Sequence, residues 1–302
     1  MVSLLCSCGK KAIYLRRYSG QLFCTQHFIE YFENKVKKVI RDRGMFSSGD
    51  RVGVALSGGK DSAVTLYLLS RFSEELGIEV VAISIDEGIR GFRENTIAKA
   101  KELCKLLDIK HHIFSFKDAI GKEVDEFPEP KCTYCGVVRR KVLNEAAVKL
   151  KVDKLATGHN LDDMAQAILM NYLRGDVERL IRLSREITTK HFVPKVRPLM
   201  EMPEKEVAIF AIVKKLPVSF DTCPYLHSAF RLRIKKIINE LERDNPGIKF
   251  SILRGYEKII PWLEDYPVKK LRKCKICGAP TSQDICKVCM IESEIVKYKE
   301  IE

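Results

Sequence analysis

Residues 51–76 read RVGVALSGGKDSAVTLYLLSRFSEEL, and this stretch predicts the fold of the central part of the chain. Its first part, 51–56, is an apolar and β-branched run that is typical of a buried strand. The last part carries apolar side chains at helical spacing, and the two glycines between the parts allow a tight turn. Amides at a helix start favour an anion, and Lys60, Ser57 and Ser62 add a positive charge and hydroxyl groups. The stretch therefore predicts a strand, a phosphate-binding turn and a helix.

The turn, Ser57 to Ser62, is not a Walker loop, because Asp61 follows the lysine where that motif needs serine or threonine. The order Ser-Gly-Gly-Lys-Asp-Ser after an apolar strand resembles the PP-loop of the ATP pyrophosphatases. In that family the loop holds the phosphates of ATP, an oxygen of the substrate attacks the α-phosphate, and pyrophosphate leaves. The alternative interpretation is a plain glycine turn with a surface lysine.

Length and composition limit the class of protein. The chain has 302 residues, enough for about two domains of about 150 residues each. It has no run of about 18 apolar residues, and its start lacks the apolar segment of a secretory signal. We therefore expect a cytoplasmic protein without a membrane partner. The formal net charge of +13 favours a polyanionic partner.

Strand-like and helix-like segments alternate through the middle of the chain, which predicts an α/β fold with a parallel sheet and right-handed crossovers. The expected strands are 51–56, 78–86, 109–116, 153–157 and 192–197, and the expected helices are 61–76, 91–107, 136–150, 160–173 and 203–215. In such sheets ligands bind beyond the carboxyl ends of the strands. Three polar loops fall there, at 57–62, 86–91 and 158–163.

The third of these loops carries two neighbouring carboxylates. It reads Gly158-His159-Asn160-Leu161-Asp162-Asp163 and opens a helix. Carboxylates in a first turn are favoured by the helix dipole, so capping is one role for the pair. Beside a phosphate loop the pair can instead hold Mg²⁺ against a triphosphate or act on the attacking oxygen. The pattern G-H-N-x-D-D resembles the second element of the tRNA-modifying PP-loop proteins, which favours the second role.

Ten of the eleven cysteines fall into three groups, which in a reducing compartment indicates metal ligands rather than disulfides. The two terminal groups have zinc-like ligand sets, and they are Cys6, Cys8, Cys24 and His27 at one end and Cys274, Cys277, Cys286 and Cys289 at the other. A short terminal segment cannot fold on an apolar core alone, so a metal ion is physically motivated. For the first group, reduced cysteines in a small hairpin are the alternative.

The third group is Cys132, Cys135 and the distant Cys223. Three thiols without an evident fourth ligand make a poor structural zinc site, because such sites are closed by four ligands. Three thiolates on a [4Fe–4S] cluster leave one iron open to another ligand. A disulfide relay of Cys132 and Cys135, or persulfide chemistry on Cys132 and Cys223, are open alternatives.

Basic segments accompany these motifs, and each is either a nucleic-acid surface or a solvated face. Two predicted amphipathic helices, 28–44 and 226–245, are rich in lysine and arginine. Arg139, Arg140 and Lys141 follow the cysteine pair and are candidates to contact ATP phosphates or RNA. The basic residues of the second helix are Arg231, Arg233, Lys235 and Lys236, and those near the last cysteines are Lys269, Lys270, Arg272, Lys273 and Lys275.

Taken together, the motifs and their order resemble the PP-loop tRNA 2-thiouridine synthases of the TtuA and archaeal NcsA type, which are related to TtcA. The resemblance implies that ATP adenylates O2 of a tRNA uridine, that sulfur then attacks C2, and that AMP leaves. It also implies a division of the chain into an N-terminal zinc finger (1–30), a linker helix (31–48), a PP-loop domain with the Fe–S site (49–226), a basic helical region (227–268) and a C-terminal zinc ribbon (269–302).

The resemblance further implies roles for single residues. Cys132, Cys135 and Cys223 would ligate a [4Fe–4S] cluster whose fourth iron carries the incoming sulfur as hydrosulfide. Arg139 and Lys60 would approach ATP, and Asp163 would lie near the reacting base. The expected nucleotide contacts are Ala55, Ser57, Gly58, Gly59, Lys60, Asp61, Ser62, Ile83, Ile85, Arg139, Gly158, Asp162 and Asp163.

Cofactors and partners follow from the same resemblance. We expect ATP, Mg²⁺, the [4Fe–4S] cluster and a zinc ion in each terminal module. The expected partners are tRNA, a second copy in a homodimer, and a sulfur donor, which is sulfide, a persulfide or a ubiquitin-like thiocarboxylate. Two other functions fit parts of the chain: a PP-loop ligase or amidotransferase that adenylates a carboxylate, and a non-catalytic zinc-dependent RNA-binding protein.

Overall fold

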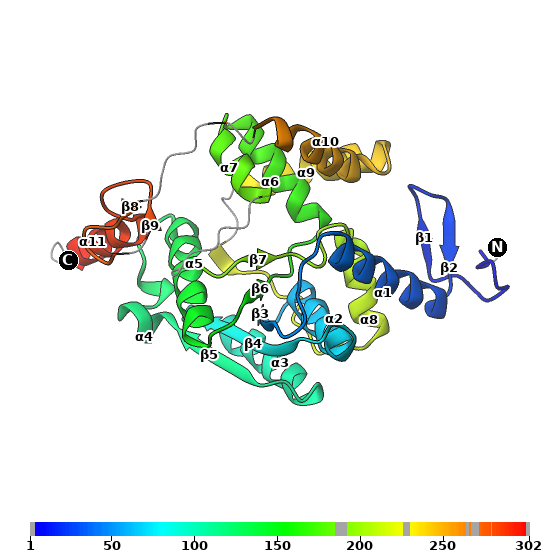
Figure 1. Ribbon diagram of the computed structural model, residues 1–302, viewed down its shortest axis with the longest axis horizontal. Helices are drawn as coiled ribbons and strands as arrows, with labels where there is room; N and C mark the ends of the chain where they lie inside the picture. The colour runs from blue at the N-terminus through cyan, green and yellow to red at the C-terminus, as the bar shows by residue number, and fades with distance from the viewer. Residues whose placement is uncertain are drawn as a thin grey trace.

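A parallel five-stranded sheet forms the centre of the computed structural model, which describes residues 4–184, 192–225, 230–263, 266, 272–278 and 280–299. The strands are β3 (Arg51–Ala55), β4 (Glu79–Asp86), β5 (His111–Ser115), β6 (Lys154–Ala156) and β7 (Lys195–Val196), in the order β5-β4-β3-β6-β7. Every neighbouring pair is parallel (Figure 1). The predicted α/β sheet is therefore confirmed.

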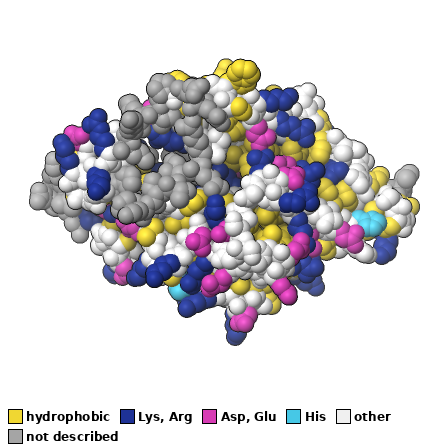
Figure 2. Space-filling model, viewed as in Figure 1, with side chains coloured by type: hydrophobic (Ala, Val, Ile, Leu, Met, Phe, Trp, Pro, Cys, Tyr) yellow, Lys and Arg dark blue, Asp and Glu magenta, His cyan; other side chains and the backbone are white. Residues whose placement is uncertain are grey.

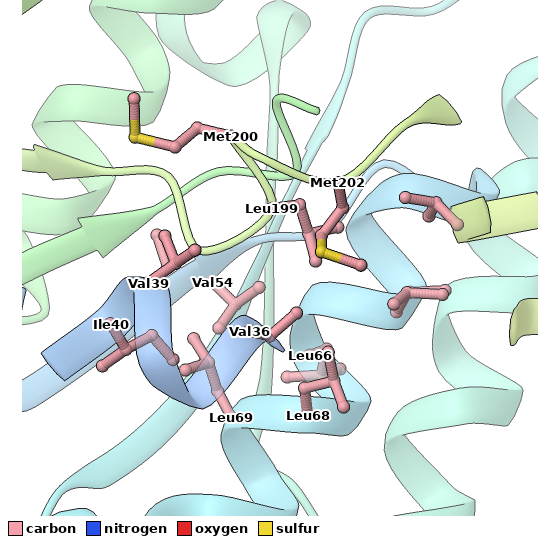
Figure 3. Packing of buried hydrophobic residues seen from close by; sticks show 14 of the residues in the cluster. Val36, Val39, Ile40, Val54, Leu66, Leu68, Leu69, Leu199, Met200 and Met202 are labelled. Atoms are coloured by element: carbon pink, nitrogen blue, oxygen red, sulfur yellow. The ribbon is translucent and has the colours of Figure 1, made fainter. Parts of the chain in front are cut away.

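One hydrophobic core lies between β3 and β4 and the helices α1 (Thr25–Asp42), α2 (Lys60–Leu76), α3 (Arg93–Leu106) and α8 (Glu204–Val213). Figure 3 shows side chains from β3, α1, α2 and the segment before α8 meeting in this core. The rings of Phe32 and Phe210 stack with their centroids 4.3 Å apart. Both elements that flank the turn, β3 and α2, are thus fixed in this core.

Helix α1 belongs to this core, whereas the sequence suggested a linker helix or a nucleic-acid surface. Its buried residues recur at helical spacing and are Phe28, Phe32, Val36, Val39 and Ile40. The basic side chains between them face outward because the apolar stripe faces the core. Lys37, for example, pairs with Glu75 of α2.

The opposite core is built around α5 (Lys131–Lys149), with α4 (Phe116–Ile120) and the short helix η1 (Val124–Glu126) beside it. The sequence predicted that this helix would start at residue 136, so that Cys132 and Cys135 would precede it. The helix instead starts at Lys131, directly after Pro130, because Cys135 packs into the same core as Val137 and Val138 and its burial offsets the cost of Gly136 within the helix. The two thiols therefore lie in its first turns on one face.

Four further helices lie on the side of the sheet where β7 forms its edge (Figure 1). They are α6 (Leu161–Leu173), α7 (Val177–Ser184), α9 (Phe230–Asp244) and α10 (Ile248–Ile259), followed by η3 (Ile260–Leu263). The expected helix 226–245 corresponds to α9, although 226–229 lie outside the described residues. It ends before Pro246 and Gly247, and α10, which the sequence analysis did not predict, follows them. No helix among the described residues has the length and apolar character needed to cross a bilayer.

The two cysteine-rich modules lie at opposite ends of the molecule (Figure 1). The N-terminal one contains the hairpin of β1 (Tyr14–Arg16) and β2 (Gln21–Phe23). The C-terminal one contains β8 (Arg272–Lys273), β9 (Pro280–Thr281) and α11 (Lys287–Lys299). Lys141 of α5 pairs with Glu292 of α11 at 3.1 Å, so the C-terminal module docks on the helix that carries Cys132 and Cys135. Lys269 and Lys270 lie outside the described residues.

A histidine on β5 makes the stability of this fold pH-dependent. The Nε2 atom of His111 lies 2.7 Å from the Ser84 hydroxyl, and burial lowers the pKa of His111 from 6.5 to about 4. Between these values the unfolded chain binds the proton first, so acidification destabilises the native state. We expect His111 to lower the free energy of unfolding by about 1 kcal/mol between about pH 7.5 and pH 5.5.

Urea unfolding at both pH values measures this effect, and His111→Gln should remove it. An identical pH dependence in the variant and the wild type would contradict the assignment.

Candidate active site

The turn after β3 has the geometry of an anion-binding loop. Gly58 has a φ of +84°, and a Cβ on it would lie 1.9 Å from the backbone oxygen of Thr96, so only glycine fits there. The amide of Ser57 donates to the Ser62 hydroxyl at 3.1 Å, which fixes the loop across its mouth. Gly59 is the N-cap of α2 and has no side chain to bond the first amides of the helix. Those amides are available to a phosphate.

The loop after β6, residues 158–163, touches the glycine turn at the point where the strand order of the sheet reverses. The chain proceeds from β3 to β4 on one side, while β6 pairs with β3 on the other, so their loops border one crevice. A Cβ on Gly158 would lie 2.7 Å from backbone atoms of Asp61 and Ser62. The Asn160 amide donates to the Asp61 carboxylate at 2.9 Å. The two motifs that the sequence singled out are thus in direct contact.

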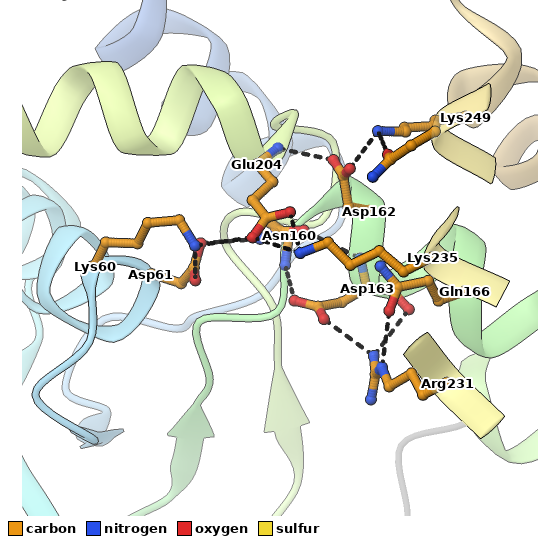
Figure 4. A network of polar contacts seen from close by, with 11 residues as sticks. Lys60, Asp61, Asn160, Asp162, Asp163, Gln166, Glu204, Arg231, Lys235 and Lys249 are labelled. Carbon is orange, nitrogen blue, oxygen red and sulfur yellow. Dashed lines mark hydrogen bonds and ion pairs between the residues drawn. The ribbon is translucent and has the colours of Figure 1, made fainter. Parts of the chain in front are cut away.

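Lys60 lies in a network of charges that reaches α8 and α9 (Figure 4). Its Nζ is 2.9 Å from Asp61 and 3.0 Å from Glu204, and Lys235 approaches Glu204 to 2.7 Å. Burial opposes the charge of Lys60, but Asp61 and Glu204 outweigh it and raise its pKa. Burial would also raise the pKa of Glu204, yet Lys235 and Lys60 lower it. Lys60 is therefore held as a cation at the start of α2 by Asp61 and by Glu204, a carboxylate that the sequence did not reveal.

The neighbouring carboxylates of the second loop have different surroundings. Asp163 and Asn160 form a capping box at the start of α6, and Arg231 approaches Asp163 to 3.0 Å. Burial raises the pKa of Asp163. Asp162 is buried, pairs with Lys249 of α10, and accepts the amide hydrogen of Glu204 at 2.8 Å. Asp162 thus links α6 to α8 and α10. Asp163 instead bonds Asn160, whose side chain donates to Asp61.

The basic side chains of α9 are divided in the same way. The sequence suggested one RNA-binding face, but Arg231 and Lys235 point toward Asp163 and Glu204 (Figure 4). Arg233 and Lys236 are exposed. The helix therefore supplies charge to the site on one side and to the surface on the other.

The segment that carries Cys223 is bound to the glycine turn. The Ser219 amide donates to the Gly58 carbonyl at 2.9 Å, so the residues after it follow the edge of the loop. Cys223 lines a cavity of about 290 Å³ together with Ser57 and Gly59. The predicted nucleotide contacts Ala55, Ile83, Ile85 and Arg139 line the same cavity. One cleft therefore contains the phosphate loop, the ends of two strands and a thiol.

Cys132 and Cys135 lie near the same place. Burial is the largest cause that raises the pKa of both thiols, and the nearby Cys223 raises both further. Cys132 donates to the Tyr225 carbonyl at 2.7 Å, and Arg139 donates to Cys135 at 3.1 Å. The ligand atoms of the terminal modules lie within 4.8 Å of one another, and these three thiols form no such group.

Soft thiolates are the ligands of iron–sulfur clusters, and the cysteines of one cluster bind different irons.

Glu87 connects the thiols with the phosphate loop, and sequence reasoning did not identify it. It is 4% exposed and lies between two arginines, with Arg139 and Arg93 each 2.6 Å from one of its oxygens. Arg93 in turn donates to the Ser57 carbonyl at 3.0 Å. The signal was its place in the polar loop 86–91, directly after β4. Of the predicted neighbours of Arg139, Arg140 is exposed and Lys141 contacts the C-terminal module instead.

Both terminal modules gather four ligand atoms. Cys6, Cys8, Cys24 and His27 form one group, so the unusual Cys6-x-Cys8 spacing does bring both thiols together. Backbone amides of Cys8 and Cys24 lower the pKa of Cys6 to about 5, which favours the thiolate that a metal requires. The second group is Cys274, Cys277, Cys286 and Cys289. Backbone amides of Cys277 and Cys286 lower the pKa of Cys274 to about 6.

The sequence and the fold of this chain are similar to those of known proteins. A family described as the PP-loop domain matches residues 29–241, and one described as the N-terminal LIM domain of 2-thiouridine synthetase TtuA matches residues 5–29. The tRNA 2-thiolation protein NcsA of Haloferax volcanii is 36% identical, with 95% of this chain and 97% of that protein covered. This chain belongs to the PP-loop tRNA 2-thiolation family.

Two further members of the family extend the comparison. The tRNA-5-methyluridine(54) 2-sulfurtransferase of Pyrococcus horikoshii is 38% identical over 93% of this chain and 91% of its own. The U34-tRNA thiolase NcsA from Methanococcus maripaludis, solved with its [4Fe–4S] cluster, has a TM-score of 0.84 and 37% identity and covers 97% of each chain. All three relatives are tRNA-thiolating proteins, which favours thiolation over carboxylate ligation or RNA binding alone.

Proposed function

We propose that this chain is an ATP-dependent tRNA-uridine 2-sulfurtransferase that forms 2-thiouridine in tRNA. The observation that carries the proposal is the bond between Ser219 and Gly58, because it brings the segment of Cys223 to the phosphate loop. Activation of an oxygen and delivery of a sulfur atom to the same carbon require that nucleotide and sulfur meet in one cleft. Family membership supports the same reaction.

In this proposal the phosphate loop and its surroundings carry the first half-reaction. Loop amides and Lys60 bind the phosphates of ATP, and the apolar ends of β3 and β4 hold the adenine. Asp163 accepts the N3 proton of the uracil as O2 attacks the α-phosphate, and pyrophosphate leaves. The raised pKa of Asp163 suits this proton transfer. Adenylation converts O2 into a good leaving group.

In the second half-reaction a sulfur atom bonds to C2 and AMP departs. A [4Fe–4S] cluster held by Cys132, Cys135 and Cys223 would supply an iron without a protein ligand, to which sulfur can bind. Arg139 lies between Cys135 and Glu87 and borders the nucleotide cavity, so its positive charge can stabilise the departing phosphate.

The proposal also includes details that membership of the family does not by itself establish. We include Mg²⁺ at the triphosphate, Zn²⁺ in each terminal module, a homodimer and a cytoplasmic location. The sulfur donor is sulfide, a persulfide or a ubiquitin-like thiocarboxylate. The relatives act on uridines at different tRNA positions, 34 and 54, so the modified base is tested by mapping the product.

The proposal is tested with anaerobically reconstituted protein, ATP, sulfide and unmodified tRNA. We expect 2-thiouridine in digested tRNA by mass spectrometry, and none when ATP is omitted. Wild-type protein that carries its metals and binds ATP but forms no thionucleoside with any of the three donors would contradict the proposal.

Replacing one zinc ligand of the N-terminal module gives a separate expected result. Elemental analysis should find about two zinc ions per chain, and Cys8→Ser should lose about one of them, because a structural site is closed by four ligands. The released N-terminal module should also become sensitive to protease, since a segment of this size depends on its metal. Cys104→Ser is the control, since that thiol lies in the core cluster of α3. Unchanged zinc in the Cys8 variant would contradict the ligand set.

A further inference from the structure

A groove runs beside the N-terminal hairpin and ends at the phosphate loop. One cavity of about 510 Å³ is bordered by the hairpin, α8, α9 and α10, and Lys60 lies in its wall. A second cavity of about 280 Å³ shares Tyr18, Pro246 and Phe250 with the first. We call the two together the hairpin groove. Its volumes lie near the range of about 300–1,000 Å³ that is usual for ligand sites.

The groove carries unneutralised positive charge. Arg17 and Lys205 line the first cavity and Arg254 the second, and all three are exposed. Within the described ranges of the chain, none of these three forms an ion pair with a carboxylate. Figure 2 shows Lys and Arg side chains gathered at the upper right, over α9 and α10.

The carboxylates of the groove are already engaged. Asp162 pairs with Lys249, and Glu204 pairs with Lys60 and Lys235. Glu242 accepts backbone amides at the start of α10, at 2.8 and 3.1 Å. The groove therefore offers a surplus of cations to an anionic ligand.

Aromatic rings lie between these cations. Tyr14, Tyr18 and Phe250 are half-buried, and the ring centroids of Tyr18 and Phe250 are 5.0 Å apart. The hydroxyls of Tyr14 and Tyr18 donate to buried Glu206 at 3.1 and 3.4 Å, which fixes both rings. Fixed rings among arginines and lysines are typical of surfaces on which unpaired bases stack while phosphates bind the cations.

We propose that the hairpin groove binds unpaired nucleotides of the substrate tRNA that flank the uridine at the phosphate loop. This inference rests on the proposed function, because it assigns a part of that same substrate to a site. An RNA strand fits because charge, stacking surface and continuity with Lys60 occur together, and a small anion would need only the first. The N-terminal module then acts as one wall of the groove.

The test is tRNA binding measured by fluorescence anisotropy over a series of KCl concentrations. The variant is Arg17→Glu combined with Lys205→Glu. Both side chains are exposed, and a glutamate in the first turn of α8 is favourable to that helix. The control is Lys105→Glu combined with Lys110→Glu, an equal charge change at exposed residues near β5, at the far edge of the sheet.

We expect the groove variant to bind tRNA about tenfold more weakly at low salt, and the slope of log K against log[KCl] to fall by about 1.4–1.8 for two lost phosphate contacts. The control should lose much less, and both should bind ATP like the wild type. Photo-crosslinking with tRNA that carries 5-iodouridine beside the target base should label Tyr18 or Phe250.

Equal tRNA affinity and salt slope for the groove variant and the control would overturn the inference, as would crosslinks confined to residues outside the groove. In either case, a wild type that thiolates tRNA leaves the proposed function intact. A wild type that neither binds nor thiolates tRNA removes both.

Discussion

Replacing Cys223 by alanine is expected to lower thionucleoside formation by about a thousandfold or more, while ATP affinity changes little. The thiol borders the cavity that contains Ser57 and Gly59, and the next residues lead to Tyr225, whose carbonyl accepts from Cys132. Loss of one of three thiolates should prevent a cluster from assembling, whereas the amides that bind phosphate remain. Iron and sulfide analysis, ATP binding and product formation are measured on the same preparation.

The matched control is Cys104→Ala, which removes a buried thiol from α3 in the opposite core cluster. It should retain iron, sulfide and activity. Iron content and product that are equal in the Cys223 variant and the wild type would show that this thiol has no part in the reaction.

Two adjacent glycines of the phosphate loop should respond very differently to the same substitution. Gly58→Ala introduces a Cβ 1.9 Å from the Thr96 backbone oxygen at a φ of +84°, so the loop or α3 must move. We expect ATP affinity to fall about a hundredfold, since misplacement of about 1 Å has an effect of this size. A Cβ on Gly59 meets only the Ser57 hydroxyl, at 3.6 Å, so Gly59→Ala should be tolerated.

Isothermal titration with a non-hydrolysable ATP analogue measures the difference, and circular dichroism checks that both variants are folded. If the two variants bound ATP equally well, the loop would not hold the phosphates in the manner described.

Much of the fold was predictable because its signals are local. An apolar strand, a glycine turn and a helical repeat need only about 25 neighbouring residues, and the alternation of strands and helices predicts a parallel sheet. The two terminal ligand sets were predictable for the same reason, because their spacing brings the ligands together. Element boundaries were harder to predict, as the start of α5 shows, because burial of Cys135 in the core extends the helix back to Lys131.

The residues that sequence reasoning missed act through partners distant in the chain. Glu87 and Glu204 are isolated carboxylates in the sequence, and only the fold places them beside Arg139 and Lys60. Asp162 and Asp163 look equivalent in the sequence, yet successive residues of a helix point in different directions. Asp162 therefore pairs with Lys249, while Asp163 bonds Asn160, whose side chain donates to Asp61.

The central claim is that the nucleotide and the three-thiol site share one cleft. The most direct measurement is ³¹P electron–nuclear double resonance on the reduced, iron-loaded protein with an ATP analogue bound. We predict a ³¹P coupling to the iron centre in the wild type that is lost in Gly58→Ala. A fully loaded wild-type protein that binds the analogue but shows no ³¹P coupling would contradict the claim.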